Sequence, residues 1–319
     1  MALLREIDFS RVLFAAAIAL LAAGPIAWLI GTWLDPAFDS HGFAYFAVVL
    51  ALAAWSFTSP HTSAASPADR RIALILLTAT ALVRLAGQVL AIDTIGALAL
   101  VIDVYALARL AGLERRARAL SSFWLAFGFA FALPLERIVQ RAIGYLLQDV
   151  SAQGACGVLS ALFGQVQCAG VRITVDGADV LVDLPCSGAR AIIMFGFAFA
   201  VAAALARPGF RMVALGAALT LGAALAGNVL RITMLAGGVA LGPEQLGFDV
   251  MAQPWHDLVG LVALGLAAPV LVLWARSAAR RPLHPFPDAS AARSPGPINT
   301  SGADRFASVE FMGPGLASR

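Results

Sequence analysis

Three residues whose side chains suit acyl transfer lie in the second half of the chain, at Cys186, Arg231 and His256. A thiol becomes a strong nucleophile when it ionises, and a helix N-terminus, a cation or an imidazole favours the thiolate. An imidazole exchanges protons near neutral pH, so His256 suits an acid and base role. A guanidinium keeps its charge and suits an oxyanion or a carboxylate. The three residues together predict catalysis by a nucleophilic cysteine.

The residues around Cys186 indicate the start of a helix. Pro185 precedes it, Ser187 and Gly188 follow it, and Arg190 lies one turn further on. A cysteine inside an apolar helix usually only packs, whereas a helix start gives the thiol a positive dipole end and a nearby cation. We therefore expect Ser187, Gly188 and Arg190 to contribute to the site or to its surroundings.

The other two candidates lie at the ends of apolar runs. Asn228 and Arg231 close one run, and His256 follows Pro254 and Trp255 at the start of the next. The simpler explanations are a membrane-anchoring arginine and a histidine that caps a helix.

The composition places the chain in a membrane, since 60% of its 319 residues are hydrophobic and 13% are charged. A span needs about 20 apolar residues. We predict an all-α polytopic bundle of about eight spans, of which the second and fifth are short. They cover residues 12–31, 42–57, 72–91, 95–113, 120–134, 187–206, 212–231 and 257–275.

The arginines predict the orientation of these spans. Clusters fall before the first span and in every second connection, which the positive-inside rule assigns to the cytoplasm. The clusters are Arg5 and Arg11; Arg70 and Arg71; Arg115, Arg116 and Arg118; Arg207 and Arg211; and Arg276, Arg280 and Arg281. Both termini are then cytoplasmic, the membrane is the cell's inner membrane, and Cys186, Arg231 and His256 meet on the extracytoplasmic side.

A long extracytoplasmic segment, residues 134–185, connects the fifth and sixth predicted spans. Its first part has an apolar stripe opposite a polar one, which predicts a helix lying in the membrane interface. The apolar stripe is Leu135, Ile138, Val139, Ala142, Leu146 and Val150, and the polar side is Arg137, Gln140, Arg141 and Gln148. Residues 171–175 and 178–183 alternate around Asp176-Gly177, which predicts a β-hairpin.

The remaining cysteines lie in this outer segment. Cys156 and Cys168 either form a disulfide or stay as two buried thiols. The cysteine and histidine spacing fits no zinc motif, so we expect neither a metal nor a cofactor. A net charge of +3 spread between apolar runs does not fit a nucleic-acid partner.

Arg84 and Asp103 are charged residues near the middle of two predicted spans. Arg84 and Asp103 come at similar depth in adjacent spans, so a buried ion pair with a structural role is expected, and a part in a substrate pocket is the alternative. Residues 1–281 form the predicted membrane domain. Residues 282–319, rich in Pro, Ser, Ala and Gly, form a predicted disordered cytoplasmic tail.

Four features in order along the chain resemble the exosortases and archaeosortases. They are the Pro-led segment Pro134 to Gln148, Cys186-Ser187-Gly188 with Arg190, Asn228-Val-Leu-Arg231, and His256-Asp-Leu-Val-Gly260. The resemblance covers residues 134–274. Its implied activity is cleavage of a C-terminal sorting signal on exported proteins, made of a short motif, a transmembrane helix and an Arg-rich tail.

The same resemblance assigns roles to the residues. Cys186 would carry the acyl group as a thioester, Arg231 would assist at the carbonyl, and His256 would transfer protons. Membrane lipid is the expected surrounding. The alternatives are a polytopic transporter or scaffold without peptidase activity and a serine hydrolase that uses Ser187, although no Gly-x-Ser-x-Gly motif occurs.

Overall fold

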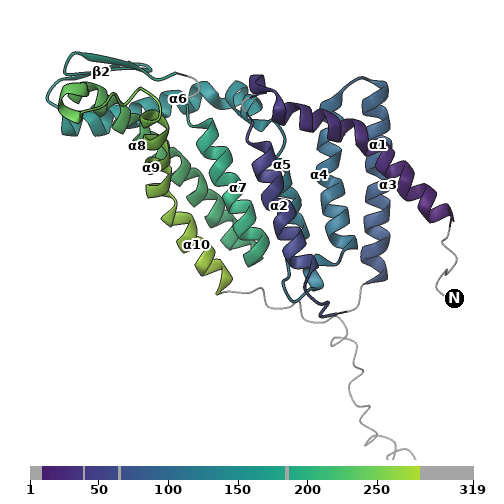
Figure 1. Ribbon diagram of the computed structural model, residues 1–319. Helices are drawn as coiled ribbons and strands as arrows, with labels where there is room; N and C mark the ends of the chain where they lie inside the picture. The colour runs from purple at the N-terminus through teal and green to yellow at the C-terminus, as the bar shows by residue number, and fades with distance from the viewer. Residues whose placement is uncertain (1–8, 39, 64–65, 184–186, 281–319) are drawn as a thin grey trace, which may run out of the picture. The chain divides into compact units, whose positions relative to one another are not determined.

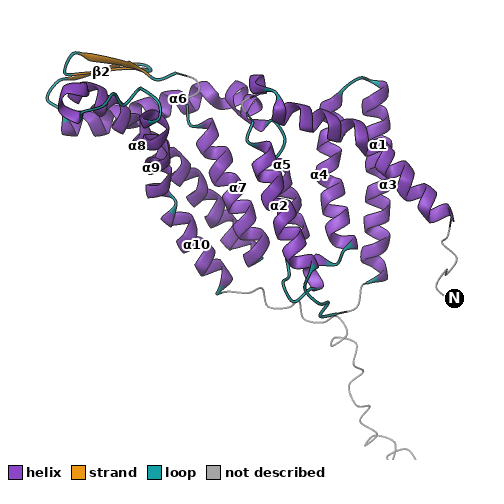
Figure 2. Ribbon diagram, in the orientation of Figure 1, coloured by secondary structure: helices purple, strands orange, loops and turns teal. Residues whose placement is uncertain are grey.

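The computed structural model describes residues 9–280, apart from residues 39, 64–65 and 184–186. Helices make up most of this part, and a small sheet lies at one end of them (Figures 1 and 2). The helices are α1 (Phe9–Leu34), α2 (Gly42–Phe57), α3 (Pro67–Val89), α4 (Asp93–Leu110), α5 (Ser122–Ala130), α6 (Leu135–Leu162), α7 (Ala189–Ala206), α8 (Phe210–Leu246), α9 (Trp255–Ala267) and α10 (Pro269–Ala279). The strands are β1 (Val166–Ala169), β2 (Arg172–Val175) and β3 (Ala178–Leu181). Cys186 and the predicted tail, residues 282–319, lie outside the described residues.

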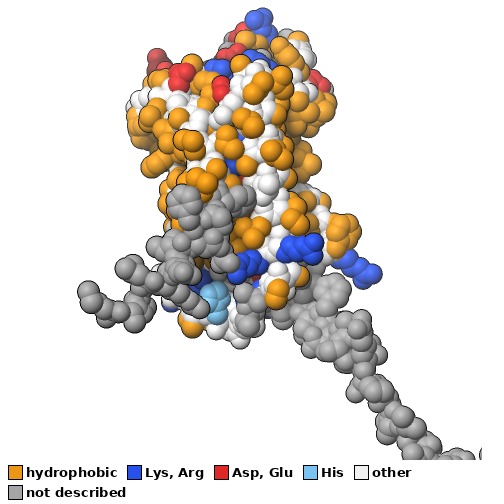
Figure 3. Space-filling view, turned by 90° about the vertical axis from the view of Figure 1, so that its right-hand side faces the viewer, with side chains coloured by type: hydrophobic (Ala, Val, Ile, Leu, Met, Phe, Trp, Pro, Cys, Tyr) orange, Lys and Arg blue, Asp and Glu red, His pale blue; other side chains and the backbone are white. Residues whose placement is uncertain are grey.

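The chain is a helical polytopic membrane protein with fewer full spans than predicted. Among the described residues, six helices are long and apolar enough to cross a membrane. The predicted span at 42–57 is α2, which has only 16 residues. The predicted span at 120–134 is the 9-residue α5, which bends by 77° into α6; that bent pair counts as a seventh span if it crosses. Exposed apolar side chains cover the flank seen in Figure 3, as expected of a surface in contact with lipid.

The ends of the helices that carry the arginine clusters lie together. The Thr62 amide donates to the Arg115 carbonyl at 2.8 Å, and the Ser121 amide donates to the Ala204 carbonyl at 2.9 Å. These bonds connect the loop after α2, the α4–α5 connection and the end of α7, which lie at the lower end of Figure 1. The clusters at residues 115–118 and 207–211 therefore lie at the same end of the helices, while Arg5 and Arg281 lie outside the described residues. The identity of the membrane side remains a prediction.

The opposite end of the helices carries a three-stranded antiparallel sheet of order β1-β2-β3. The predicted hairpin is confirmed, because β2 and β3 pair around Asp176 and Gly177, which have φ angles of 49° and 87°. Positive φ at both turn residues suits the twist of a tight hairpin. The strand β1, paired with β2, was not predicted.

The predicted interface helix corresponds to α6, which continues to Leu162. Much of its apolar stripe is exposed, with 53% of Ile138 and 64% of Leu146 accessible, as a lipid-facing stripe should be, whereas Leu135 packs against the core. Gln148 lies opposite the exposed residues of that stripe, as predicted, and this side faces the protein, where the Gln148 amide donates to the Val182 carbonyl. A buried amide needs such a partner, and helical spacing alone does not reveal one.

The ion pair between Arg84 and Asp103 is confirmed. Arg84 is fully buried on α3 and contacts the Asp103 carboxylate on α4, which also accepts from the Thr80 hydroxyl. A charge in an apolar bundle is stable only when it is paired and hydrogen-bonded. The pair therefore fixes α3 against α4.

Candidate functional site

Arg231 and His256 meet between neighbouring helices. Arg231 is on α8 and His256 is in the first turn of α9, and Arg231 Nη2 lies 2.8 Å from His256 Nε2. A guanidinium can only donate, so the Nε2 lone pair accepts and the ring proton belongs on Nδ1. The close packing of the two helices follows from Gly227, since a Cβ there would lie 3.3 Å from Ala267 Cβ.

Gly260 lies one turn after His256 on the same face of α9. A Cβ at Gly260 would lie 3.4 Å from Arg231 Nε and 3.7 Å from Cζ. The His-x-x-x-Gly spacing thus places both residues beside one side chain: His256 contacts the end of the Arg231 guanidinium, and Gly260 lies against its Nε and Cζ.

The prediction that Arg231 ends its helix was wrong. The helix α8 continues to Leu246, with non-helical backbone at Gly242, where φ is 73° and ψ is 163°. Arg231 therefore lies about three helical turns before Gly242, inside a long helix. Because residues 232–241 are largely apolar, a span of ordinary length can be placed at several positions along this run.

Asn228 connects α8 to the start of α7 and to α6. Its Nδ2 donates to Ser151 Oγ at 2.9 Å, and Ser151 Oγ lies 3.5 Å from the Ser187 carbonyl. Gly188 has a φ of 97°, and a Cβ there would lie 2.9 Å from Asn228 Nδ2. Only glycine accepts both the positive φ and the close contact with Asn228 at low cost. This explains the glycine at position 188, two residues after Cys186.

Ser187 is fully buried, and its Oγ lies 3.5 Å from the Ala189 amide. A nucleophile must reach a substrate carbonyl, so a buried hydroxyl on this turn does not support the serine hydrolase alternative. Ser187 instead contributes its carbonyl to the network around Ser151.

Arg190 is paired with an acidic residue on α6. Its Nε lies 3.1 Å from Glu136 Oε1, and the Glu136 side chain is 13% exposed. This ion pair joins the start of α7 to the start of α6. It also offsets part of the positive charge that Arg190 brings to the region.

Four of the predicted residues, Gly188, Arg190, Asn228 and Arg231, border one small cavity of about 40 Å³, whereas His256 and Ser187 are not among its lining residues. It is lined by Gly188, Arg190, Ala191, Gly227, Asn228, Arg231, Gly260 and Leu264. Arg231 Nε is buried and has no hydrogen-bond partner among the described residues. A buried N–H group without a hydrogen-bond partner costs free energy. The Arg231 side chain that carries this N–H borders the cavity. Gly188, two residues after Cys186, lines the same cavity.

Cys156 and Cys168 are joined by a disulfide between α6 and β1, with their Cα atoms 6.4 Å apart. This is the first of the two alternatives that the sequence left open. The disulfide links the C-terminal part of α6 to strand β1 of the sheet. The sheet lies at the same end of the helices as residue 187, just before the start of α7.

Two contributors to the site were missed in the sequence. Glu136 and Ser151 both lie on α6, the former in its first turn and the latter fully buried. The available signal was a small and polar stripe at helical spacing, namely Gln148, Ser151, Ala152 and Ala155, opposite the exposed apolar stripe.

Comparison with known protein families gives one match. The family of transmembrane exosortases matches residues 33–273, which is more than half of the chain. The match begins well before the resemblance at residues 134–274, so it includes the N-terminal helices α2 to α5. A comparison with curated proteins and one with solved structures found no match.

Proposed function

Because the chain belongs to the transmembrane exosortase family, we propose that it is a cysteine transpeptidase or protease that processes exported proteins at the outer face of the inner membrane. Its substrates would carry a C-terminal signal consisting of a short motif, a transmembrane helix and an Arg-rich tail. The observation that carries this proposal is the Arg231–His256 pair beside a cavity that Gly188 also lines.

In the proposed reaction, the Cys186 thiolate attacks the carbonyl carbon of the scissile peptide bond. A C–S bond forms, the carbonyl π pair moves to oxygen, and the resulting oxyanion needs hydrogen-bond donors. Collapse of this intermediate breaks the C–N bond, and the leaving amine takes a proton. The thioester then passes to an acceptor nucleophile, which restores the thiol.

Arg231 supports the proposed oxyanion role because its Nε has no partner among the described residues while its Nη2 holds His256. One planar group with several fixed donors can serve both an imidazole and an oxyanion.

His256 supports the proton-transfer role because its Nε2 already accepts from Arg231. A proton taken from Cys186 onto that nitrogen requires Arg231 to release it, and the released donor then becomes available to the oxyanion. Thiol ionisation and carbonyl binding would thus be coupled through one hydrogen bond.

The test is processing of a co-expressed substrate that carries a C-terminal signal of this kind, followed by gel shift. Cys186→Ala is expected to abolish processing. Arg231→Lys keeps a charge but loses the planar fork, so processing should fall by roughly 100-fold or more, the typical cost of one oxyanion donor. His256→Ala should fall comparably.

Arg172→Lys is the matched control for Arg231→Lys. Arg172 lies on β2, and its side chain is 61% exposed, so processing should not change. Processing by Cys186→Ala at the rate of the unmodified protein would refute the proposal.

A further inference from the structure

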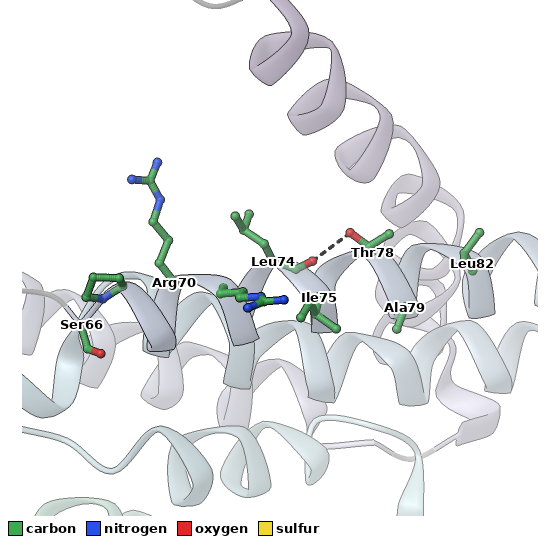
Figure 4. A pocket seen from close by; sticks show the side chains of 9 residues that line it. Ser66, Arg70, Leu74, Ile75, Thr78, Ala79 and Leu82 are labelled. Atoms are coloured by element: carbon green, nitrogen blue, oxygen red, sulfur yellow. Dashed lines mark hydrogen bonds between the residues drawn. The ribbon is translucent and has the colours of Figure 1, made fainter.

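An exposed face of α3 combines two arginines with two rows of mostly apolar residues. Side chains four residues apart lie above one another on a helix. The first row is Arg70, Leu74, Thr78 and Leu82, and the second is Arg71, Ile75 and Ala79. Figure 4 shows Leu74 and Thr78 on the same side of the helix as Arg70, and Ile75 and Ala79 on the other. Each row is headed by a cation.

This face is open along its length. It borders a hollow of about 740 Å³, and Ile75 and Leu82 are 57% and 64% exposed. The Thr78 hydroxyl donates to the Leu74 carbonyl at 2.8 Å (Figure 4). Because that bond satisfies its polar atom, Thr78 can present its methyl group to the row.

The charge of the two arginines is not offset nearby. Asp69 precedes them, but its two carboxylate oxygens contact Arg109 and Arg115. Within the described part of the chain, no ion pair involves Arg70 or Arg71, and both are exposed. Two positive charges therefore remain at the end of a membrane-spanning helix, at the level where lipid headgroups lie.

We infer that this face of α3 binds an anionic diacyl phospholipid. Guanidinium groups suit phosphate oxygens, so Arg70 and Arg71 hold the headgroup. From Leu74 to Leu82 the helix rises by about 12 Å, enough for the upper part of two acyl chains to lie along the rows. A ligand with one anionic head and two chains fits two parallel apolar rows that begin at adjacent cations.

The experiment titrates the purified full chain in neutral detergent with phosphatidylglycerol or with phosphatidylcholine of the same chains, and native mass spectrometry counts the bound lipid. Phosphatidylglycerol should bind more tightly. Arg70→Ala with Arg71→Ala should weaken its binding by roughly 25-fold, since each basic residue near a headgroup contributes about a factor of five. Equal affinity for the two lipids would overturn the inference.

Arg207→Ala with Arg211→Ala is the matched control, because it removes two exposed arginines from the end of α7 and the start of α8. It should leave phosphatidylglycerol binding unchanged, and an equal loss in both double variants would reduce the effect to net charge and overturn the inference. Deletion of residues 1–8 should likewise leave binding unchanged. Tight binding that appeared only after that deletion would assign this face to the chain's own N-terminus instead.

Discussion

At the scale of single residues, the candidate site depends on side chains that hold one another. Arg231 holds His256 from α8, Asn228 contacts Ser151, and Gly188 lies against Asn228. Each contact joins a different pair of helices. A small change at one residue should therefore move a second candidate residue. Glycines occupy the positions where two helices come closest together, because they have no side chain to separate them.

Gly188→Ala tests this dependence. The new Cβ would meet Asn228 at about 3 Å in a backbone conformation that alanine rarely adopts, so a loss of roughly 1–3 kcal/mol in the free energy of unfolding is expected. Substrate processing should fall with it. Thermal unfolding in detergent and the gel-shift assay measure the two effects.

Gly157→Ala on α6 serves as the control for that prediction. A Cβ there has nothing within 4 Å, and alanine favours a helix over glycine by up to about 1 kcal/mol. Equal or higher stability is expected. Full stability and full activity of Gly188→Ala would contradict the account of the turn after Cys186.

At this scale the sequence predicted the residue types but not their partners. Arg231 and His256 could be paired in advance because the predicted topology placed both at the same side of the bundle, although the predicted helix end at Arg231 was wrong. Ser151 and Glu136 could not, because a serine and a glutamate on an amphipathic helix are usually solvated. Their partners depend on how α6 is rotated about its axis, which periodicity fixes only approximately.

At the scale of elements, α6 orients the start of α7. It carries Ser151 toward Asn228 and Ser187, Glu136 toward Arg190, and Cys156 toward the sheet. Ser151→Ala should remove the hydrogen bond that Asn228 Nδ2 donates to Ser151 Oγ, at a cost of about 0.5–1.5 kcal/mol in the free energy of unfolding. Ser160→Ala, an exposed position on the same helix, should cost nothing measurable, and equal effects of the two changes would contradict this role.

Arg116 joins the ends of two helices at the opposite side of the fold. Its guanidinium donates to the Ser59 carbonyl at 2.8 Å and to the Ala111 carbonyl at 3.2 Å, and it lies 4.4 Å from the Phe57 ring centre. Terminal helix carbonyls favour such a cation. Arg116→Ala should lower the free energy of unfolding by roughly 2–3 kcal/mol.

Arg118→Ala is the appropriate comparison for Arg116→Ala. Arg118 has one described side-chain hydrogen bond, to the Trp55 carbonyl at 3.3 Å, and its guanidinium lies 5.2 Å from the Trp55 ring centre, so its loss should cost about 1 kcal/mol or less. Thermal unfolding of both variants in one detergent measures the difference, and a similar loss in both would argue against a specific cap.

Elements with strong local signals were predicted best. The Asp176-Gly177 turn specified its hairpin because those two residues accept positive φ. The strand β1 was missed because Val166–Ala169 has no clear alternation and depends on its pairing with β2. The continuation of α8 was missed because a span length sets only the minimum length of a helix.

At the scale of the whole molecule, the arginine-bearing helix ends lie together, and α6 and the sheet lie at the other end (Figure 1). The positive-inside rule assigns the first end to the cytoplasm, an orientation that remains a prediction. It requires the hairpin to face the outside of the inner membrane.

Cysteine labelling tests this orientation in a Cys186→Ser background. A membrane-impermeant maleimide should label Gly177→Cys, in the hairpin turn, in cells whose inner membrane is intact. It should label Arg118→Cys, at the other end, only after the membrane is opened. The reverse pattern would place the candidate site in the cytoplasm and remove exported proteins as its substrates.

We propose that Cys186 carries an acyl group beside the Arg231–His256 pair, and intact mass spectrometry of the protein after brief exposure to substrate can detect that group. The expected result is a mass increase equal to the N-terminal fragment of the substrate less one water, mapped to Cys186 and released by hydroxylamine as a thioester should be. Substrate cleavage without an adduct on Cys186, or with the adduct on another residue, would contradict it.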